Sequence, residues 1–83
     1  MTPLEFAGLP INSQVQIVIS EGREILDRIF LYYIIKLYLY NGIYVEIWYQ
    51  QIGNKIDKVQ IVDLDDVIHL YESQININDL FKE

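Results

Sequence analysis

The pair Asn41-Gly42 constrains the fold more than any other feature of this chain, because it stands between two runs with the composition of β-strands. Residues 31–40 are aromatic or β-branched apart from their leucines and one lysine, and residues 43–49 are so apart from one glutamate. Asn-Gly is strongly favoured at the tip of a tight turn between antiparallel strands. We therefore expect a β-hairpin that turns at these two residues.

Two registers are open to this hairpin, and they predict different cores. A two-residue turn places Leu37 opposite Glu46 and Lys36 opposite Ile47, which mixes apolar and charged residues on both faces. A three-residue loop with a bulge at Gly42 pairs Lys36 with Glu46 instead and leaves one face apolar throughout. We favour the bulged register for that reason. Because a slip of one residue turns every side chain to the other face, this choice also defines the expected core: Ile35, Leu37, Val45 and Ile47.

Before the hairpin, the chain predicts an arm, a helix and a segment with two interpretations. Residues 1–10 contain two prolines and predict an irregular N-terminal arm. A helix capped by Asn12 or Ser13 is expected to end at Gly22, since glycine is favoured just past the end of a helix. Residues 23–31 fit either a short edge strand near 24–29, which we favour, or the continuation of one long helix.

After the hairpin, a second turn and a second helix complete the predicted fold. The chain is expected to turn again through residues 52–54 and to add a strand beside the first hairpin. Asp63 or Asp65 then caps a helix whose apolar stripe runs to Ile75. We predict an α+β fold in which residues 1–83 form a single domain. Its sheet is a three- or four-stranded antiparallel β-meander, with the N-terminal and C-terminal helices packed on one face.

Charge and composition exclude several classes of partner and site. The chain has a net charge of −6 and only six basic residues, whereas binding to nucleic acid or to an anionic membrane needs clustered Lys and Arg. It has no cysteine, which excludes disulfides and thiolate metal sites. The most apolar run, residues 29–40, contains Lys36 and is too short to span a bilayer, which takes about 20 residues. With no signal peptide visible, we expect a soluble cytoplasmic protein that binds neither nucleic acid nor membranes.

The second face of the predicted hairpin is the strongest indication of function. If both helices cover the apolar face, the tyrosine and tryptophan side chains of the other face lie exposed, unless the N-terminal arm covers them. Exposed apolar patches on small proteins mark interfaces, and Tyr and Trp are favoured anchors there. We predict that this face forms a homodimer or binds a protein partner through six residues: Tyr32, Ile34, Tyr38, Tyr44, Trp48 and Lys58.

A second candidate site consists of Asp63, Asp65, Asp66 and His69, whose side chains could hold a metal or a small ligand. The simpler interpretation is an acidic helix start that complements the helix dipole. No Ser/His/Asp arrangement and no glycine-rich phosphate loop is present, and the carboxylates indicate no catalytic pair. We therefore predict no enzymatic activity, no catalytic residue, no metal and no cofactor. Two alternatives stay open: a ligand- or metal-binding domain that uses Asp63–His69, and an acidic antitoxin-like inhibitor of a basic partner.

Four segments of the chain, taken together, form a recognisable sequence pattern: Gly22-Arg23-Glu24, Ile35-Lys36-Leu37-Tyr38, Gly42-Ile43-Tyr44-Val45-Glu46-Ile47-Trp48-Tyr49 and Ile75-Asn76-Ile77-Asn78-Asp79-Leu80-Phe81. In this combination the chain resembles a group of small uncharacterised bacterial proteins over roughly residues 13–81. The resemblance implies a break at Gly22 and a bacterial cytoplasmic protein. It implies no particular chemistry.

Overall fold

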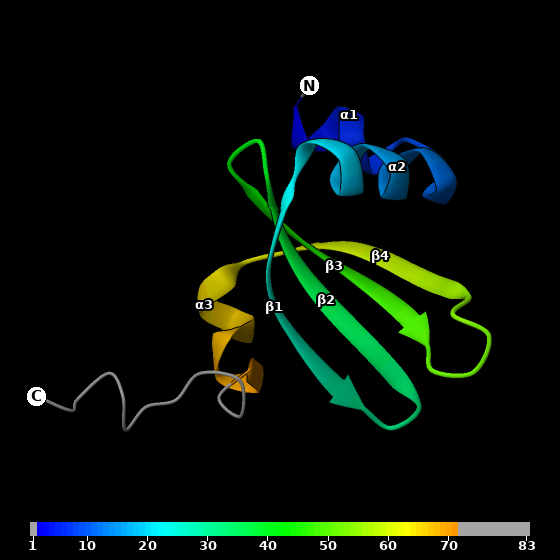
Figure 1. Ribbon diagram of the computed structural model, residues 1–83. Helices are drawn as coiled ribbons and strands as arrows, with labels where there is room; N and C mark the ends of the chain where they lie inside the picture. The colour runs from blue at the N-terminus through cyan, green and yellow to red at the C-terminus, as the bar shows by residue number, and fades with distance from the viewer. Residues whose placement is uncertain (1, 72–83) are drawn as a thin grey trace, which may run out of the picture.

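The computed structural model describes residues 2–71 as an antiparallel sheet of four strands with short helices before and after it (Figure 1). The strands lie in the sheet in chain order, so β1 and β4 form its two edges. The α+β class and the antiparallel meander predicted from the sequence are confirmed. The elements are α1 (Pro3–Ala7), α2 (Ile11–Glu21), β1 (Arg23–Phe30), β2 (Tyr33–Tyr40), β3 (Ile43–Gln50), β4 (Ile56–Val62), α3 (Leu64–Val67) and the 3₁₀ helix η1 (Ile68–Tyr71).

The N-terminal arm that was predicted to be irregular contains the helix α1. Thr2 caps it: the Thr2 hydroxyl accepts a hydrogen bond from the Glu5 N–H at 3.2 Å, and the Glu5 carboxylate accepts one from the Thr2 N–H at 3.1 Å. This reciprocal pair is a capping box, and Pro3 suits the first helical position because no N–H partner is needed there. The helix buries Phe6, whose ring centre lies 5.7 Å from that of Tyr40. Pro3 therefore marks a helix start and not an irregular segment.

Gly22 ends α2, as predicted, but the helix begins at Ile11 after Pro10, so the predicted cap at Asn12 or Ser13 is wrong. The Gly22 N–H donates to the Val18 carbonyl at 2.8 Å, and the Gly22 backbone is extended because β1 begins at the next residue. A Cβ atom on Gly22 would lie 2.6 Å from the Val18 oxygen and 3.1 Å from the Leu39 oxygen. Only glycine therefore lets the end of α2 lie this close to β2. Residues 23–30 form a full edge strand, which decides between the two interpretations of this segment in favour of the strand.

The central hairpin has a two-residue turn, and the bulged register predicted from the sequence is wrong. Asn41 and Gly42 have φ angles of 49° and 80°. Positive φ at both positions is the conformation of a type I′ turn, whose twist matches that of the flanking strands. As a result, Leu37 is paired with Glu46 in the sheet, and Lys36 with Ile47.

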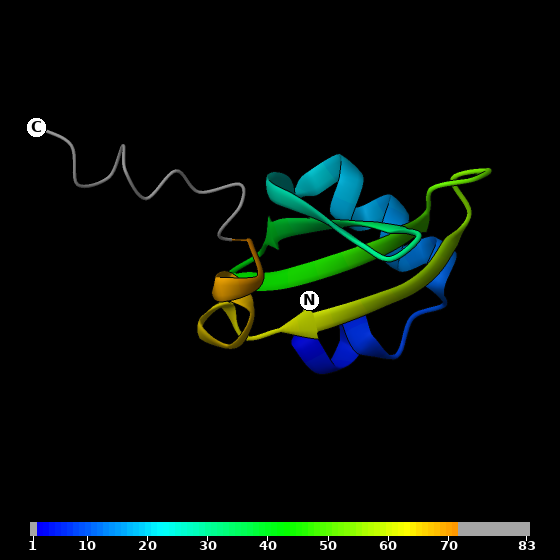
Figure 2. The same cartoon turned by 90° about the horizontal axis from the view of Figure 1, so that it is seen from below.

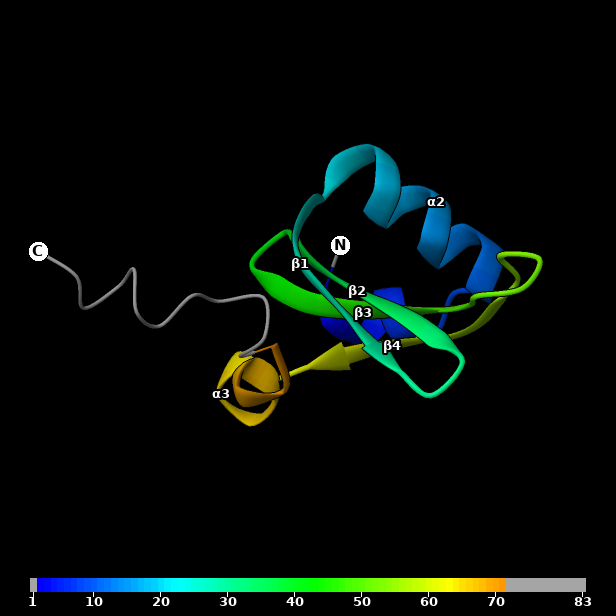
Figure 3. The ribbon, with the colours of Figure 1, turned by 60° about the horizontal axis from the view of Figure 1, so that its bottom comes forward.

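The sheet is covered on both of its faces. Tyr38 packs with Val18 of α2 on one face, and Leu37 packs with Val67 and Tyr71 on the other. Figure 3 shows α2 on one side of the sheet and α3 on the other. The expectation that both helices share a face is therefore wrong, because the tight turn leaves apolar residues on each face that need cover. The four predicted core residues are all fully buried, but they are divided between the faces, with Ile35 and Leu37 on one and Val45 and Ile47 on the other.

Two short helices stand where the sequence predicts one C-terminal helix. The Asp63 carboxylate accepts a hydrogen bond from the Asp65 N–H at 3.4 Å and caps α3, and η1 follows directly. Ile75, the expected end of the apolar stripe, lies outside the described residues. The β1–β2 and β3–β4 turns lie at the end of the sheet away from α3 (Figures 1 and 2).

Candidate functional site

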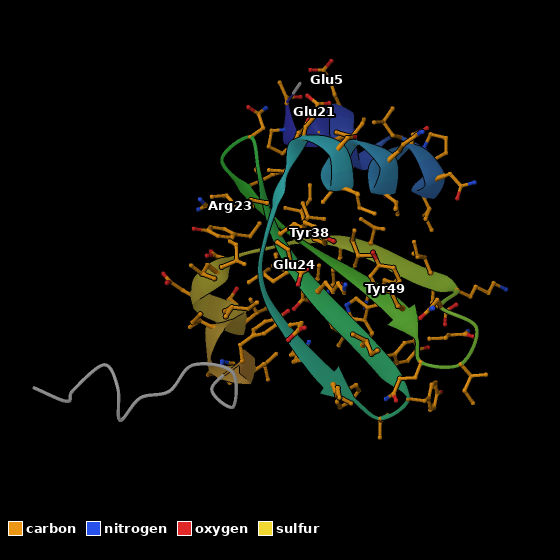
Figure 4. All side chains as sticks on the ribbon, viewed as in Figure 1. Glu5, Glu21, Arg23, Glu24, Tyr38 and Tyr49 are labelled. Atoms are coloured by element: carbon orange, nitrogen blue, oxygen red, sulfur yellow. The ribbon has the colours of Figure 1, made fainter. Side chains whose placement is uncertain are left out.

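The six residues predicted to share one open face are divided between different environments. Tyr38 lies beneath α2 with 7 % of its surface exposed, and this burial raises the pKa of its hydroxyl to about 12 (Figure 4). Ile34 lies half-buried on the same face as Tyr38. Tyr44 lies on the opposite face, half-buried against the cluster around Leu37 and Tyr71. The predicted face therefore does not exist as one surface.

The other three residues do come together, at the end of the sheet away from α3. Trp48 and Lys58 are paired across β3 and β4, and Lys58 Nζ lies 4.5 Å from the centre of the indole ring. This is a cation–π contact. Tyr32, in the β1–β2 turn, is 63 % exposed. Part of the predicted interface therefore belongs to one surface, although that surface has a different outline.

A continuous chain of four aromatic rings forms the body of this surface. Phe30 and Trp48 meet edge to face with ring centres 6.2 Å apart. Tyr33 also contacts Trp48 edge to face, at 5.3 Å. The chain ends with Tyr32, whose ring centre lies 4.8 Å from that of Tyr33. Aromatic pairs in such geometries stabilise each other beyond the effect of burial alone, so the rings form a pre-arranged unit.

The two neighbouring turns add aliphatic side chains to the rings. The Gln51 N–H donates to the Tyr32 carbonyl at 2.9 Å, and the Gln51 side-chain amide donates to the Leu31 carbonyl at 3.2 Å. These bonds tie the β3–β4 turn to the β1–β2 turn. Leu31 and Ile52, which are 70 % and 89 % exposed, are therefore held beside the rings. We call this surface the aromatic end, and its residues are Phe30, Leu31, Tyr32, Tyr33, Trp48 and Ile52.

Leu31 has an unusual backbone for an exposed leucine. Its φ angle is 55°, in the left-handed region, which costs an L-residue with a Cβ roughly 1–2 kcal/mol. A glycine or an asparagine would occupy this position at lower cost. The turn therefore displays a large apolar side chain to solvent where both folding and solubility favour a small or polar one. Strained residues of this kind cluster at functional sites.

The aromatic end carries no charge of its own. Residues 29–35 and residues 47–54 contain no Asp, Glu, Lys or Arg. Arg28, which lies over the Trp48 ring at 5.6 Å, is largely buried and paired with Glu46. Three exposed charges stand in and just after the β3–β4 turn, at Lys55, Asp57 and Lys58. Within residues 2–71, none of these three forms a salt bridge. We call them the charged rim.

Asp57 is held in place at this rim by neutral donors. Its carboxylate accepts hydrogen bonds from the Gln50 side-chain amide at 2.9 and 3.0 Å and from the Tyr33 hydroxyl at 3.0 Å. The bonds from Gln50 and Tyr33, with the charge of Lys55, lower the pKa of Asp57, and the bond to Asp57 raises the pKa of Tyr33. Asp57 is therefore an ionised carboxylate with a fixed direction at neutral pH.

A buried carboxylate lies beneath the aromatic end, on the side towards η1. Glu46 is fully buried and accepts hydrogen bonds from the Tyr71 hydroxyl at 2.7 Å and the Gln60 amide at 2.9 Å. The Arg28 guanidinium and the Trp48 indole N–H complete its partners, each at 3.4 Å. Burial, and then the bond to Glu46, raise the pKa of Tyr71. With four donors on a carboxylate closed to solvent, this cluster attaches η1 to the sheet and offers no group to a substrate.

The acidic segment around α3 has a structural role in the described chain. Asp63 caps α3, Asp65 and Asp66 lie in its first turn, and His69 follows in η1. Among residues 2–71, no group of three or more His, Cys, Asp or Glu side chains is placed to hold a metal ion. No helix in that part of the chain is long and apolar enough to cross a membrane.

Comparison with known proteins found no similar protein. No protein-family model matches the chain, and neither the curated proteins nor the solved structures include a significant match. The resemblance to small bacterial proteins and the cytoplasmic location stay predictions. The aromatic end, with its chain of rings, displayed leucine and charged rim, is the surface from which a function can be argued.

Proposed function

We propose that this protein is a non-enzymatic interaction protein that binds a protein surface through the aromatic end. The observation that carries the proposal is the exposure of the run from Ile29 to Tyr32, four consecutive large apolar residues, beside Ile52. Runs of exposed apolar residues of this length work against folding and solubility unless they serve binding. The left-handed backbone of Leu31 adds a further cost that a binding role would explain.

The composition of the aromatic end favours a protein as the partner. The cores of protein interfaces are depleted of charge and enriched in Tyr, Trp and Phe, and residues 29–35 and 47–54 match both trends. A nucleic acid would also stack on aromatic rings, but its phosphates need basic residues. Here the rim holds a carboxylate between its two lysines, and the chain as a whole has a net charge of −6.

Photo-crosslinking in the native cells tests this proposal. A photoreactive phenylalanine analogue replaces Tyr32 in the aromatic end and, as the matched control, Ser20 on the exposed side of α2. We expect a discrete protein adduct from position 32 and none from position 20. Equal adducts from both positions, or none from position 32, would contradict a binding role for the aromatic end.

A sedimentation experiment with lipid vesicles distinguishes a protein partner from a membrane. Apolar turns can also enter a bilayer, so the wild type and Leu31→Lys are sedimented with vesicles of uncharged phosphatidylcholine. We expect both to stay in solution. Co-sedimentation that is lost in Leu31→Lys would replace the protein partner with a membrane.

A further inference from the structure

We infer that the partner at the aromatic end is a second copy of this chain, related to the first by a two-fold axis. The inference rests on the proposed function, because it names the occupant of the same surface. Two observations carry it: the distribution of charge over the molecule and the mixed signs of the charged rim.

The charge distribution restricts how two copies can approach each other. Each copy carries a net charge of −6, so most orientations bring acidic groups together. Glu5 and Glu21 lie on the side of α1 and α2 (Figure 4), and Glu24, on β1, pairs with Lys36 at 3.5 Å. The acidic start of α3 lies at the end opposite the aromatic end (Figure 1). Contact through the two uncharged aromatic ends keeps these groups far apart. At ionic strengths near the physiological one, charges separated by more than about 8 Å are largely screened.

The charged rim is complementary to itself. A two-fold interface places residue i of one copy against residue j of the other, and residue j of the first against residue i of the second. A rim with one sign of charge would therefore repel its copy, whereas Asp57 between Lys55 and Lys58 forms two equivalent sets of opposite charges. Asp57 of one copy then meets the partner's Lys58, and Lys58 of the first meets the partner's Asp57.

The charges of the rim are available for this role. Within residues 2–71 the Lys58 ammonium forms no hydrogen bond or salt bridge. It lies over the indole ring of Trp48, and a contact of this kind leaves its hydrogens free to turn towards a carboxylate. Asp57 is bonded by Gln50 and Tyr33, which are neutral, and it forms no salt bridge within residues 2–71, although the charge of Lys55 acts on it. The bond from Tyr33 joins the rim to the chain of rings, so that apolar contact and ion pairing belong to one continuous surface.

The other exposed apolar residues do not offer an equivalent surface. They are distributed over the helices and the two edge strands, and among residues 2–71 no ring contact joins them: Leu4, Ile11, Ile19, Ile25, Ile61 and Leu70. Single exposed apolar side chains are normal on small proteins.

A charge exchange across the interface tests the inference. Light scattering after size exclusion should give the wild type a mass near twice 9.9 kDa at high concentration. Asp57→Lys makes the rim wholly positive, and the double variant Lys55→Asp with Lys58→Asp makes it wholly negative. Each alone should raise the dissociation constant about tenfold or more, because like charges then face each other twice. An equimolar mixture of the two variants should regain the dimer mass.

Each outcome of this experiment either supports or overturns the inference. A wild type that stays at 9.9 kDa at all concentrations overturns it. Variants with a rim of one charge sign whose dissociation constants equal that of the wild type also overturn it. A mixture of the two variants that stays monomeric does so too. A far-ultraviolet circular dichroism spectrum like that of the wild type, together with cooperative urea unfolding, shows that each variant is folded; its urea midpoint should be lower where the wild type is dimeric, because association stabilises the folded state.

A second measurement is independent of charge reversal. A carbodiimide joins a carboxylate to an amine that lies in contact with it, with formation of an amide and release of the urea by-product. In the wild type, peptide mapping should find Asp57 joined to the partner's Lys58. Asp57→Asn keeps the shape of the side chain and should remove this product. A dimer in which Asp57 is never joined to a lysine overturns the two-fold pairing of the rim.

Failure of the inference and failure of the proposed function give different results. In the crosslinking experiment at position 32, an adduct of twice the chain mass supports both. An adduct of any other mass supports the proposed function and overturns the second copy as occupant. The absence of any adduct overturns both.

Discussion

Removal of one hydroxyl, in Tyr71→Phe, tests how η1 is attached to the sheet. The Tyr71 hydroxyl donates to Glu46 at 2.7 Å, and both side chains are fully buried. A hydrogen bond to a charged group contributes about 1.5–3 kcal/mol. Gln60, Arg28 and Trp48 still bond to Glu46 in the variant, so the carboxylate does not become unpaired. We therefore expect a loss of about 2 kcal/mol in the free energy of unfolding, from the lower half of that range.

Urea unfolding followed by the fluorescence of Trp48 measures this loss. Trp48 is the only tryptophan of the chain, and its indole N–H bonds to the same carboxylate, so it reports on the cluster. The urea midpoint should fall while the slope m stays unchanged, since the surface exposed on unfolding is the same. For a domain of this size, about 2 kcal/mol corresponds to a fall of roughly 8–16 °C in Tm.

Tyr44→Phe is the matched control for this experiment. Tyr44 packs in the same cluster as Tyr71, and its hydroxyl has no hydrogen-bond partner within residues 2–71. The same chemical change there should alter the stability by less than about 0.5 kcal/mol. If Tyr71→Phe is as stable as the wild type, or if Tyr44→Phe loses as much, the attachment of η1 through Glu46 is refuted.

Three further predictions follow from the backbone and from the buried tyrosines. Gly22→Ala should lower the free energy of unfolding in urea by about 1–3 kcal/mol, because the added Cβ would lie 2.6 Å from a carbonyl oxygen of α2. The matched control, Gly8→Ala, should change it little, because the nearest atom there is 3.6 Å away. Leu31→Gly should stabilise the fold by about 1 kcal/mol and weaken association in light scattering; a variant less stable than the wild type would exclude strain at φ 55°. Burial raises the pKa of Tyr38 to about 12 and also raises that of Tyr71. Stability should therefore be complete below the ordinary tyrosine pKa of about 10 and fall as the pH rises towards 12. Tyr38→Phe should fall less steeply in a pH series of urea midpoints, and an equal slope would contradict this assignment.

Local signals predicted much of the fold. Asn41-Gly42 predicted the central hairpin, and Gly22 predicted the end of α2, because both depend on backbone geometry within a few residues. The start of α1 could also have been recognised, since Thr2 and Glu5 have the spacing of a capping box. The two prolines of the segment suggested an irregular arm instead.

The register was mispredicted because it depends on residues far along the chain. The two-residue turn was rejected because it places the charged residue Glu46 opposite Leu37. That objection holds only if Glu46 has no partners in the interior. In the fold, Arg28 and Tyr71, which are 18 and 25 residues away, bond to this carboxylate. The preference of Asn-Gly for a type I′ turn was the stronger signal.

The candidate site could be predicted in part. The aromatic residues of the hairpin drew attention to Trp48, Lys58 and Tyr32, which the fold does bring together. Leu31 was missed, because leucine is not a turn residue and its positive φ has no signal in the sequence. The sequence feature that could have indicated this surface is the unbroken apolar run from Ile29 to Tyr32.

Sedimentation equilibrium of two lysine variants shows whether the aromatic end joins two copies of the chain. Leu31→Lys places a charge in the aromatic end, and Ile19→Lys places the same charge on α2, at a side chain that is also well exposed. We expect a mass near twice 9.9 kDa for the wild type and for Ile19→Lys, and 9.9 kDa for Leu31→Lys. A dimer that survives Leu31→Lys, a dimer that dissociates in Ile19→Lys, or a wild type that is monomeric throughout would contradict this arrangement.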